Sequence, residues 1–203
     1  MNMKERMLSG LPYRGFDDVL DKERLNAQKA VYEINTLPPE RYSELSGMFK
    51  KLFGKTGEVI GIMPPFRCDY GYNIEVGENF YANYNLTILD VGKVKIGKNV
   101  MIAPNVSIYT AGHPLHPDSR NSGYEYGIPV TIGDNVWIGG SVTIVPDVHI
   151  GNNVVIGAGS VVTKDIPDNA VAVGNPCRVI RFITEEDRKY YFKSREFDVE
   201  DYR

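Results

Sequence analysis

The sequence has little of several features that would place it in a specialised class. Its 203 residues include only two cysteines, Cys68 and Cys177, which form no CxxC pair and predict two reduced thiols. No stretch approaches the roughly 20 apolar residues of a membrane span, and Met1–Gly10 lacks the apolar segment of a signal peptide. The net charge of -3 provides no general attraction to nucleic acid or anionic lipid. We therefore expect a cytoplasmic protein with neither nucleic-acid nor membrane partners.

Glycine and proline are abundant, and apolar residues recur with a period of six. The 20 glycines and 12 prolines favour a fold with many tight turns. One series of aliphatic or small residues is followed four residues later by a second, and glycine often comes directly after the first. The first series is Val76, Ala82, Ile88, Ile96, Ile102, Ile108, Ile132, Ile138, Ile144, Ile150, Ile156 and Val162.

This spacing predicts a mainly β protein whose residues 59–181 form a parallel β-helix. Short strands bury alternate residues, and Gly, Asn and Asp supply the backbone angles of the corners. Three hexads make one triangular coil, and stacked coils bury one another's aliphatic side chains. An amphipathic helix needs spacings near 3.6, and an antiparallel sandwich would place strands about every 8–12 residues. Neither pattern is present.

The period breaks at two places. Two extra residues, including Gly92, lie between Ile88 and Ile96 and predict a bulged corner. A longer insertion, residues 110–129, separates Ile108 from Ile132 and contains two of the three histidines. Insertions in a repeat protein form loops, and loops on a rigid scaffold often carry function.

The flanking segments predict short helical additions. Residues 17–35 are expected to form one helix, and a second is expected between Pro38-Pro39 and Gly54, burying Tyr42, Leu45, Phe49 and Leu52. Residues 1–58 would then cap the exposed strand edge of the first coil on the substrate side. Beyond residue 181, Thr184 and Asp187 form a capping-box pattern that predicts a short helix through Phe192 in a C-terminal tail, 182–203.

The inserted loop supplies the candidate base. A histidine such as His113 suits general base catalysis near neutral pH, although it could simply hydrogen-bond the loop backbone. His116 is interpreted as structural, and His149 as a surface residue because it lies between two inward positions. Glu125 could orient His113 and stabilise its imidazolium, or could be a solvated loop charge.

Several longer motifs closely resemble the galactoside, maltose and nodulation-type O-acetyltransferases. They are FYANYN (80–85), IAPNV (102–106), GHPLH (112–116), IGDNVWIGG (132–140), IGAGSVVTKDIP (156–167) and GNPCRVIR (174–181). The N-terminal segment is similar to the maltose type, so the resemblance covers nearly the whole chain. It implies a left-handed coil, an acetyl-CoA co-substrate, no metal requirement, and a homotrimer with active sites between subunits.

The resemblance also implies roles on the donor side. His113 matches the histidine that takes the proton of the acceptor hydroxyl as it attacks the thioester, and Asn83 matches a residue beside it. Gly140 matches a position whose backbone N–H lies near the thioester carbonyl. The remaining matches are Ala158, Thr163 and Lys164 for the pantetheine groove, and Arg178 and Arg181 for the CoA phosphates.

Spacing adds one independent observation about this groove. Gly140 and Ala158 are one eighteen-residue coil apart, so they should stack at one corner, about 5 Å from each other. Small residues in such a column leave room for a slender arm. Trp137 is expected to be an exposed wall beside the column or to pack on another subunit.

On the acceptor side, the resemblance implies Asp17 and Asp69 as contacts for sugar hydroxyls. Asp17 could instead be a charge at a helix N-terminus, and Arg24 could position the acceptor or be an exposed helix residue. Val91 stands where the galactoside enzyme has an acidic contact, with Asp90 adjacent. The sequence therefore leaves the acceptor unidentified.

Three alternatives remain open at this stage. The acceptor could be an amino sugar or serine, because the base chemistry is the same. The chain could be a β-helix metal lyase, which needs three histidine ligands for zinc. It could also be a non-catalytic scaffold, in which the loop and the arginines mediate assembly.

Overall fold

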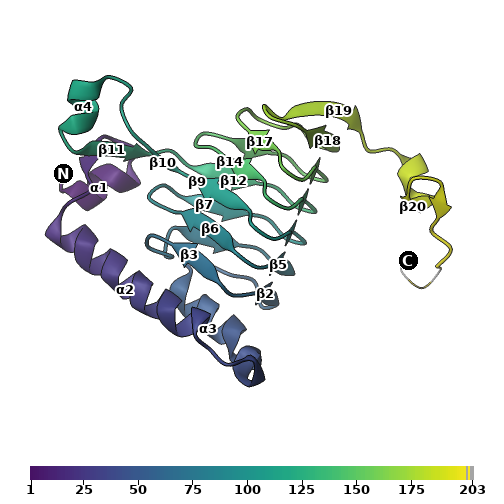
Figure 1. Cartoon of the computed structure of the whole chain (residues 1–203), viewed down its shortest axis with the longest axis horizontal. Coiled ribbons are helices and arrows are strands. Elements are labelled where there is room, and N and C mark those ends of the chain that lie inside the picture. The colour runs from purple at the N-terminus through teal and green to yellow at the C-terminus, as the bar shows by residue number, and fades with distance from the viewer. Residues whose placement is uncertain (200, 202–203) are drawn as a thin grey trace.

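The computed structural model of the protein describes residues 1–199 and 201. Its centre is a parallel β-helix in which successive coils stack along one axis (Figure 1). Three sheets form the sides. The four-stranded sheet holds β4 (Ile74–Val76), β7 (Val94–Ile96), β12 (Val130–Ile132) and β15 (His149–Ile150). The five-stranded sheet holds β3 (Phe66–Cys68), β6 (Leu86–Leu89), β9 (Ser107–Tyr109), β14 (Thr143–Ile144) and β17 (Val161–Val162). The seven-stranded sheet holds β2 (Ile60–Ile62), β5 (Phe80–Ala82), β8 (Met101–Ile102), β13 (Trp137–Ile138), β16 (Val155–Ile156), β18 (Ala170–Val173) and β19 (Arg178–Phe182).

The period-six residues form the core, as predicted. Ile138 pairs in register with Ile102 below it and Ile156 above it, and all three are buried. Their outward neighbours on the same strands, such as Trp137, are exposed. Because side chains alternate across a strand, a two-residue strand suffices to place one residue inside the coil and one outside.

Asparagines with left-handed backbone form one corner of the coil. Their φ angles lie between 55° and 60°, a region that asparagine tolerates better than most residues. Each side-chain amide donates to the next along the axis at 2.9–3.0 Å. We call this the asparagine ladder; it comprises Asn79, Asn99, Asn135, Asn153 and Asn169.

A second corner carries the extra residues of the repeat. Ile60 pairs with Phe80 and Ile74 with Val94, a step of twenty residues. Higher in the coil Trp137 pairs with Val155, a step of eighteen. The turns that carry the extra residues, 69–73 and 90–93, lie where the five-stranded sheet gives way to the four-stranded sheet. Loop 110–129 leaves from the same corner. We call these three segments the loop corner.

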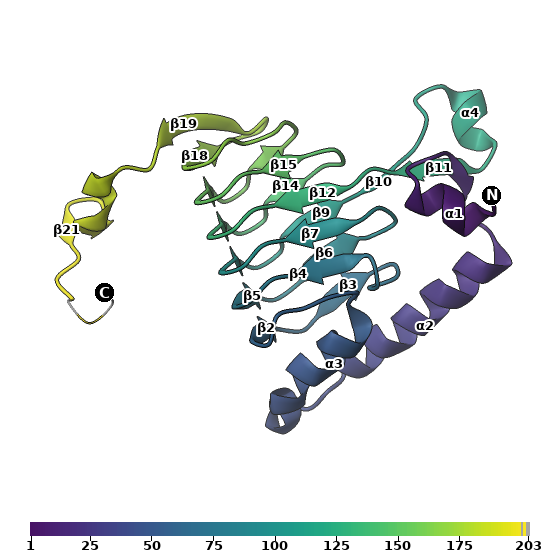
Figure 2. The same ribbon diagram turned by 180° about the vertical axis from the view of Figure 1, so that it is seen from behind.

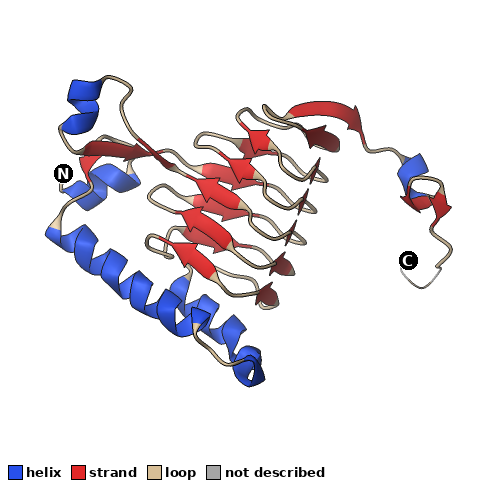
Figure 3. Ribbon diagram, in the orientation of Figure 1, coloured by secondary structure: helices blue, strands red, loops and turns tan. Residues whose placement is uncertain are grey.

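Helices cover the first coil (Figure 3). They are α2 (Asp18–Asn35), a 3₁₀ turn (Pro39–Glu44) and α3 (Leu45–Leu52), whereas α1 (Met3–Leu8) lies beside the inserted loop (Figure 1). The predicted second helix is therefore a 3₁₀ turn that leads into a shorter α-helix. Leu45 and Phe49 are buried, and Phe49 packs on Phe53 and Phe66 with ring centroids 5.3–5.5 Å apart. This aromatic cluster closes the open end of the hydrophobic core.

The other end is closed by β19, which turns back antiparallel along β18. A capping box joins Thr184 and Asp187 as predicted, but the 3₁₀ helix that it opens ends at Arg188. The prediction of a helix through Phe192 is wrong. Aromatic residues favour extended backbone, and β20 (Tyr190–Phe192) pairs with β21 (Arg195–Glu196) in a hairpin. This tail stands away from the coil (Figure 2). Positions 200, 202 and 203 of the predicted tail lie outside the described residues.

Candidate functional site

The inserted loop is an ordered excursion from the coil. It consists of β10 (Ala111–Gly112), α4 (Pro117–Asn121) and β11 (Tyr124–Gly127), with β10 and β11 antiparallel. His113 follows β10 directly and is exposed. His116 accepts the Asp118 N–H at its Nδ1 and so caps α4, which gives it the structural role predicted.

An unpredicted strand from the N-terminal segment pairs with this loop. The strand β1 (Tyr13–Arg14) lies antiparallel to β11, with Tyr13 opposite Glu125. The Tyr13 hydroxyl donates a 2.5 Å hydrogen bond to Glu125 Oε1. No local pattern joins residues so far apart in sequence, so this pairing could not be read from the repeat.

His113 and Glu125 line one hollow between the loop and the start of α2. Its volume is about 450 Å³. Its walls are Gly15, Phe16, Arg24, His113, Arg120, Gly123, Tyr124 and Glu125. The structure therefore brings together three predicted site residues, His113, Glu125 and Arg24. Histidine, carboxylate and guanidinium around one opening provide a base, an acceptor and a fixed cation for a polar ligand.

Arg24 is held in place by the turn that precedes α2 and by the first coil. It donates to the Tyr70 hydroxyl at 2.7 Å and to the Gly15 carbonyl at 2.5 Å, and it also pairs with Asp21. Asp17 lies next to this turn, where its carboxylate accepts the Val19 and Leu20 N–H groups as the N-cap of α2. Asp17 is thus already engaged in a helix cap.

Two further predicted carboxylates lie at the loop corner. Asp90 is fully buried, and its Oδ1 accepts the backbone N–H groups of Asp69 and Tyr70 at 2.9 Å. Its side chain supports the turn at residues 69–73 and does not line the hollow. Burial, assisted by the Asp90 charge, raises the pKa of Asp69 to about 6, although Arg24 opposes the shift.

The donor-side residues form a different corner, where the seven-stranded sheet gives way to the five-stranded sheet. Asn83 follows β5, Gly140 lies two residues beyond β13 and Ala158 two beyond β16. The Gly159 N–H donates to the Gly140 carbonyl at 2.8 Å, so the two coils stack as the spacing predicts. We call Asn83, Gly140 and Ala158 the small-residue corner.

Gly139, next to Gly140 in the small-residue corner, has no room for a side chain. A Cβ added at Gly139 would lie 2.6 Å from the Ala158 nitrogen. Gly140 has more room, because its nearest neighbour would be the Pro104 carbonyl at 3.4 Å. Trp137 stands exposed two residues before this pair, as predicted for a wall. At Gly140 and Ala158 the corner is therefore lined by backbone and by one methyl group.

The remaining predicted CoA residues lie near the last coils. Thr163 and Lys164 follow β17 and are exposed, on the edge that leads to the loop corner. Arg178 and Arg181 lie on the exposed strand β19. Arg181 makes a two-point ion pair with Asp187 at 2.8–2.9 Å, so an incoming phosphate would compete with this carboxylate.

Comparison with known proteins decides the family. Residues 6–57 match the maltose acetyltransferase hexapeptide capping motif, and residues 129–164 match the bacterial transferase hexapeptide model. The chain is 49% identical to the galactoside O-acetyltransferase of Escherichia coli strain K12, covering 95% of both chains. It belongs to the maltose and galactoside type of hexapeptide-repeat acetyltransferase.

Solved structures of this acetyltransferase family agree with that assignment. A maltose O-acetyltransferase from Clostridium difficile 630 is 58% identical, with a TM-score of 0.90 over 91% of this chain and 99% of that one. A galactoside acetyltransferase in complex with coenzyme A is 47% identical, with a TM-score of 0.94 over 98% and 100%. The fold and the enzyme class predicted from the motifs are thereby confirmed.

The other histidine and the cysteines of the acetyltransferase lie apart from the hollow. His149 begins β15 and is exposed, as predicted. Cys68 and Cys177 are free thiols, and burial raises the pKa of both. Among residues 1–199 and 201, no three His, Cys, Asp or Glu side chains converge as a metal site. No helix in the same range is long and apolar enough to cross a membrane.

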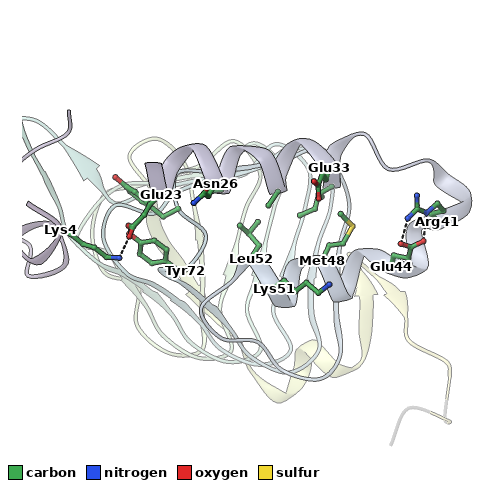
Figure 4. Close-up of a pocket in the computed structure, with 14 residues that line it drawn as sticks. Lys4, Glu23, Asn26, Glu33, Arg41, Glu44, Met48, Lys51, Leu52 and Tyr72 are labelled. Carbon is green, nitrogen blue, oxygen red and sulfur yellow. Dashed lines mark hydrogen bonds and ion pairs between the residues drawn. The ribbon is translucent and has the colours of Figure 1, made fainter. Parts of the chain in front are cut away.

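A second hollow of about 540 Å³ lies between α2 and α3 of the acetyltransferase (Figure 4). Glu23 anchors one end, where it accepts hydrogen bonds from Lys4 and from the Tyr72 hydroxyl. Arg41 and Glu44 form an ion pair at the other end. Within the described chain its lining includes none of the predicted site residues.

Proposed function

We propose that this acetyltransferase moves the acetyl group of acetyl-CoA to a hydroxyl of a sugar or a related small acceptor. The observation that carries the proposal is His113, which is exposed and lines the hollow beside Glu125 and Arg24 at the loop corner. The relatives that act on maltose and on galactosides support a sugar hydroxyl as the acceptor. The relative in complex with coenzyme A supports the donor.

In the proposed reaction, His113 is the general base. The acceptor oxygen attacks the thioester carbonyl carbon while the imidazole takes the hydroxyl proton. The C–S bond then breaks, and the protonated His113 returns the proton to the leaving CoA sulfur. A hydroxyl has a pKa far above 7, so a positioned base contributes about 10²- to 10⁴-fold. Glu125 stabilises the imidazolium, and the backbone N–H at Gly140 faces the oxygen that gains negative charge.

The placement of the two corners favours a homotrimer with sites between subunits. In one chain the loop with α4 lies on one side of the coil, and β5 with β18 lies on the other (Figure 1). His113 of one subunit would therefore meet the small-residue corner of its neighbour. Tyr81, Met101 and Trp137 form an exposed apolar row on the seven-stranded sheet, and such a face suits a partner subunit.

Acetyl-CoA fits the small-residue corner by shape and the last coils by charge. Its slender pantetheine arm suits a column with no side chain larger than a methyl group at Gly140 and Ala158. Thr163 and Lys164 lie on the edge that leads to the loop corner, so in a trimer they would reach the arm from the subunit that supplies His113. Arg178 and Arg181 bind the phosphates, for which a guanidinium is well suited. A cytoplasmic setting is part of the same proposal and is consistent with the two free thiols.

The acceptor is held by the hollow around His113. Arg24 lines this hollow and donates to the acceptor hydroxyls. Asp69 is not part of the lining and would accept from an acceptor that extends to the loop corner, while Asp17 and Asp90 act indirectly through the α2 cap and the 69–73 turn. An amino group could enter the same hollow, so an amino sugar or serine is the alternative acceptor. A metal lyase and a scaffold are less well supported, because the histidines are separated and a base lies in the hollow.

The decisive test compares His113→Ala with His116→Ala. We expect His113→Ala to lose acetyl transfer at least a hundredfold while it retains acetyl-CoA binding. His116→Ala changes a histidine of the same loop that only caps α4, so it should keep most activity. CoA thiol release is followed with sugars, amino sugars and serine as acceptors. Unchanged turnover in His113→Ala would overturn the assignment, and no CoA release with any acceptor would favour the scaffold.

A further inference from the structure

The strand β1 connects the helical cap to the catalytic loop through only two residues. Tyr13 and Arg14 pair with Glu125 and Tyr124, which lie in β11 on the far side of the inserted loop. Backbone pairing of this kind fixes the position of Glu125 relative to the cap. It leaves the side-chain torsions of Glu125 unrestrained, so the orientation of the carboxylate needs a further contact.

The Tyr13 side chain provides that contact. Tyr13 is fully buried with Met7, Leu20, Tyr70 and Val91 in a small second core. Its hydroxyl donates to Glu125 Oε1 at 2.5 Å. Burial and the adjacent carboxylate raise the pKa of Tyr13 strongly, so the phenol stays protonated and remains a donor. A rigid aromatic ring with one torsionally free hydrogen thus holds one carboxylate oxygen.

We infer that Tyr13 is a positioning residue of the transferase, which orients the Glu125 carboxylate so that its second oxygen faces the hollow of His113. The inference rests on the proposed function, in which Glu125 supports His113. Within the described residues Oε2 of Glu125 accepts no hydrogen bond, whereas Oε1 is occupied by the phenol. One oxygen is therefore anchored and the other remains available for the imidazolium or an acceptor hydroxyl.

Gly15 provides the space for this arrangement. A Cβ added at Gly15 would lie 2.7 Å from Glu125 Oε1 and 3.4 Å from Oε2. The Gly15 carbonyl is itself held by Arg24 at 2.5 Å, so the backbone cannot easily yield. A side chain at position 15 would thus push the carboxylate from its position. Residues 13–15 of the cap therefore provide both the hydrogen bond to Glu125 and the space that its carboxylate needs.

A purely structural role for Tyr13 makes a different prediction, because a buried ring could matter only for packing. Tyr72 offers the matched control. Its hydroxyl also donates to a cap carboxylate, Glu23, at 2.8 Å, but Tyr72 and Glu23 lie in the second hollow and not in that of His113 (Figure 4). Tyr72→Phe therefore removes the same kind of bond from the same cap without reaching Glu125.

The test is a double-mutant cycle measured by CoA release under saturating acetyl-CoA. Tyr13→Phe should lower kcat on the order of 10- to 100-fold, the range expected for one lost hydrogen bond to a charged group. The same substitution in a Glu125→Ala background should change kcat by less than about twofold, because its target is gone. Gly15→Ala should lower kcat in the same direction, and Tyr72→Phe should leave it unchanged. Thermal unfolding of each variant checks that the cap remains folded.

The outcomes separate this inference from the function on which it rests. Equal losses for Tyr13→Phe in both backgrounds would show that the hydroxyl acts through a contact other than Glu125. An unchanged kcat would show that the bond is dispensable. Either result overturns the inference alone. A wild-type protein that releases no CoA with any acceptor overturns the proposed function and the inference together. The positioning role is supported if Tyr13→Phe lowers kcat only in the protein that retains Glu125 and if Tyr72→Phe leaves kcat unchanged.

Discussion

If Asp69 binds the acceptor as proposed, acceptor binding should depend on pH in a range where an ordinary aspartate stays ionised. It lies at the loop corner beside the buried Asp90, and both burial and that charge favour its protonated form. The resulting pKa is about 6, against an ordinary value of 3.8. Because the folded-state pKa is raised, the charged form that accepts hydroxyl hydrogen bonds is present above pH 6 and is lost as the pH falls.

The size of the effect follows from this pKa. At pH 5 a carboxyl with a pKa near 6 is about one-tenth ionised, whereas one at 3.8 would be about nine-tenths ionised. If only the carboxylate binds the acceptor, the acceptor KM should rise about tenfold between pH 7 and pH 5. Asp69→Asn should have a raised KM at pH 7 and no such rise at lower pH.

Initial rates at varied acceptor concentration, with a thiol reagent that works in acid, separate KM from kcat at each pH. The KM profile follows acceptor binding, and the kcat profile follows the steps of the bound complex. Arg24→Gln is a control for the direction of the effect. The Arg24 charge lowers the Asp69 pKa, so its loss should move the midpoint of the KM profile to higher pH. A wild-type KM that stays flat down to pH 5, or an Asp69→Asn variant that keeps the rise, would refute the reasoning.

Two further predictions concern the coil and the donor side. Asn135→Ala and Asn135→Gly both lose two ladder hydrogen bonds, but only alanine is strained at the φ of 57°. The free energy of unfolding of Asn135→Ala, measured with denaturant, should therefore be lower than that of Asn135→Gly by about 1–2 kcal/mol. Equal midpoints would mean that the backbone angle costs nothing. Ala158 is exposed, so Ala158→Leu should fill the small-residue corner without disturbing the core. The KM for acetyl-CoA should then rise at least tenfold, and the KM for the acceptor should not change. An unaltered KM for acetyl-CoA would place the pantetheine arm elsewhere.

The repeat pattern was enough to predict the coil, because each coil of a β-helix contacts only the coils next to it. Each hexad buries its own aliphatic residue, such as Ile138, and the next coil repeats the choice at Ile156. The same logic located the inserted loop, where the period fails, and the stacking of Gly140 on Ala158. Handedness does not follow from spacing, and the resemblance alone implied it.

The tail and the second cap helix show where local rules were too coarse. The capping box at Thr184 and Asp187 was read correctly, yet the helix ends after one turn. The aromatic run that follows prefers a hairpin, and a cap specifies where a helix starts but not how long it lasts. The 3₁₀ geometry of Pro39–Glu44 was likewise invisible, because a proline at the first turn permits either type of helix.

The sequence by itself determined the architecture and the location of the candidate base. Repeat spacing places most inward residues of the coil, and the loop that interrupts it carries His113. The tertiary structure alone decided which groups surround that histidine. It buries Asp90 under the 69–73 turn and joins Tyr13 to Glu125. These contacts form between segments distant in the chain, where burial and pairing, and not local backbone preference, choose the partner.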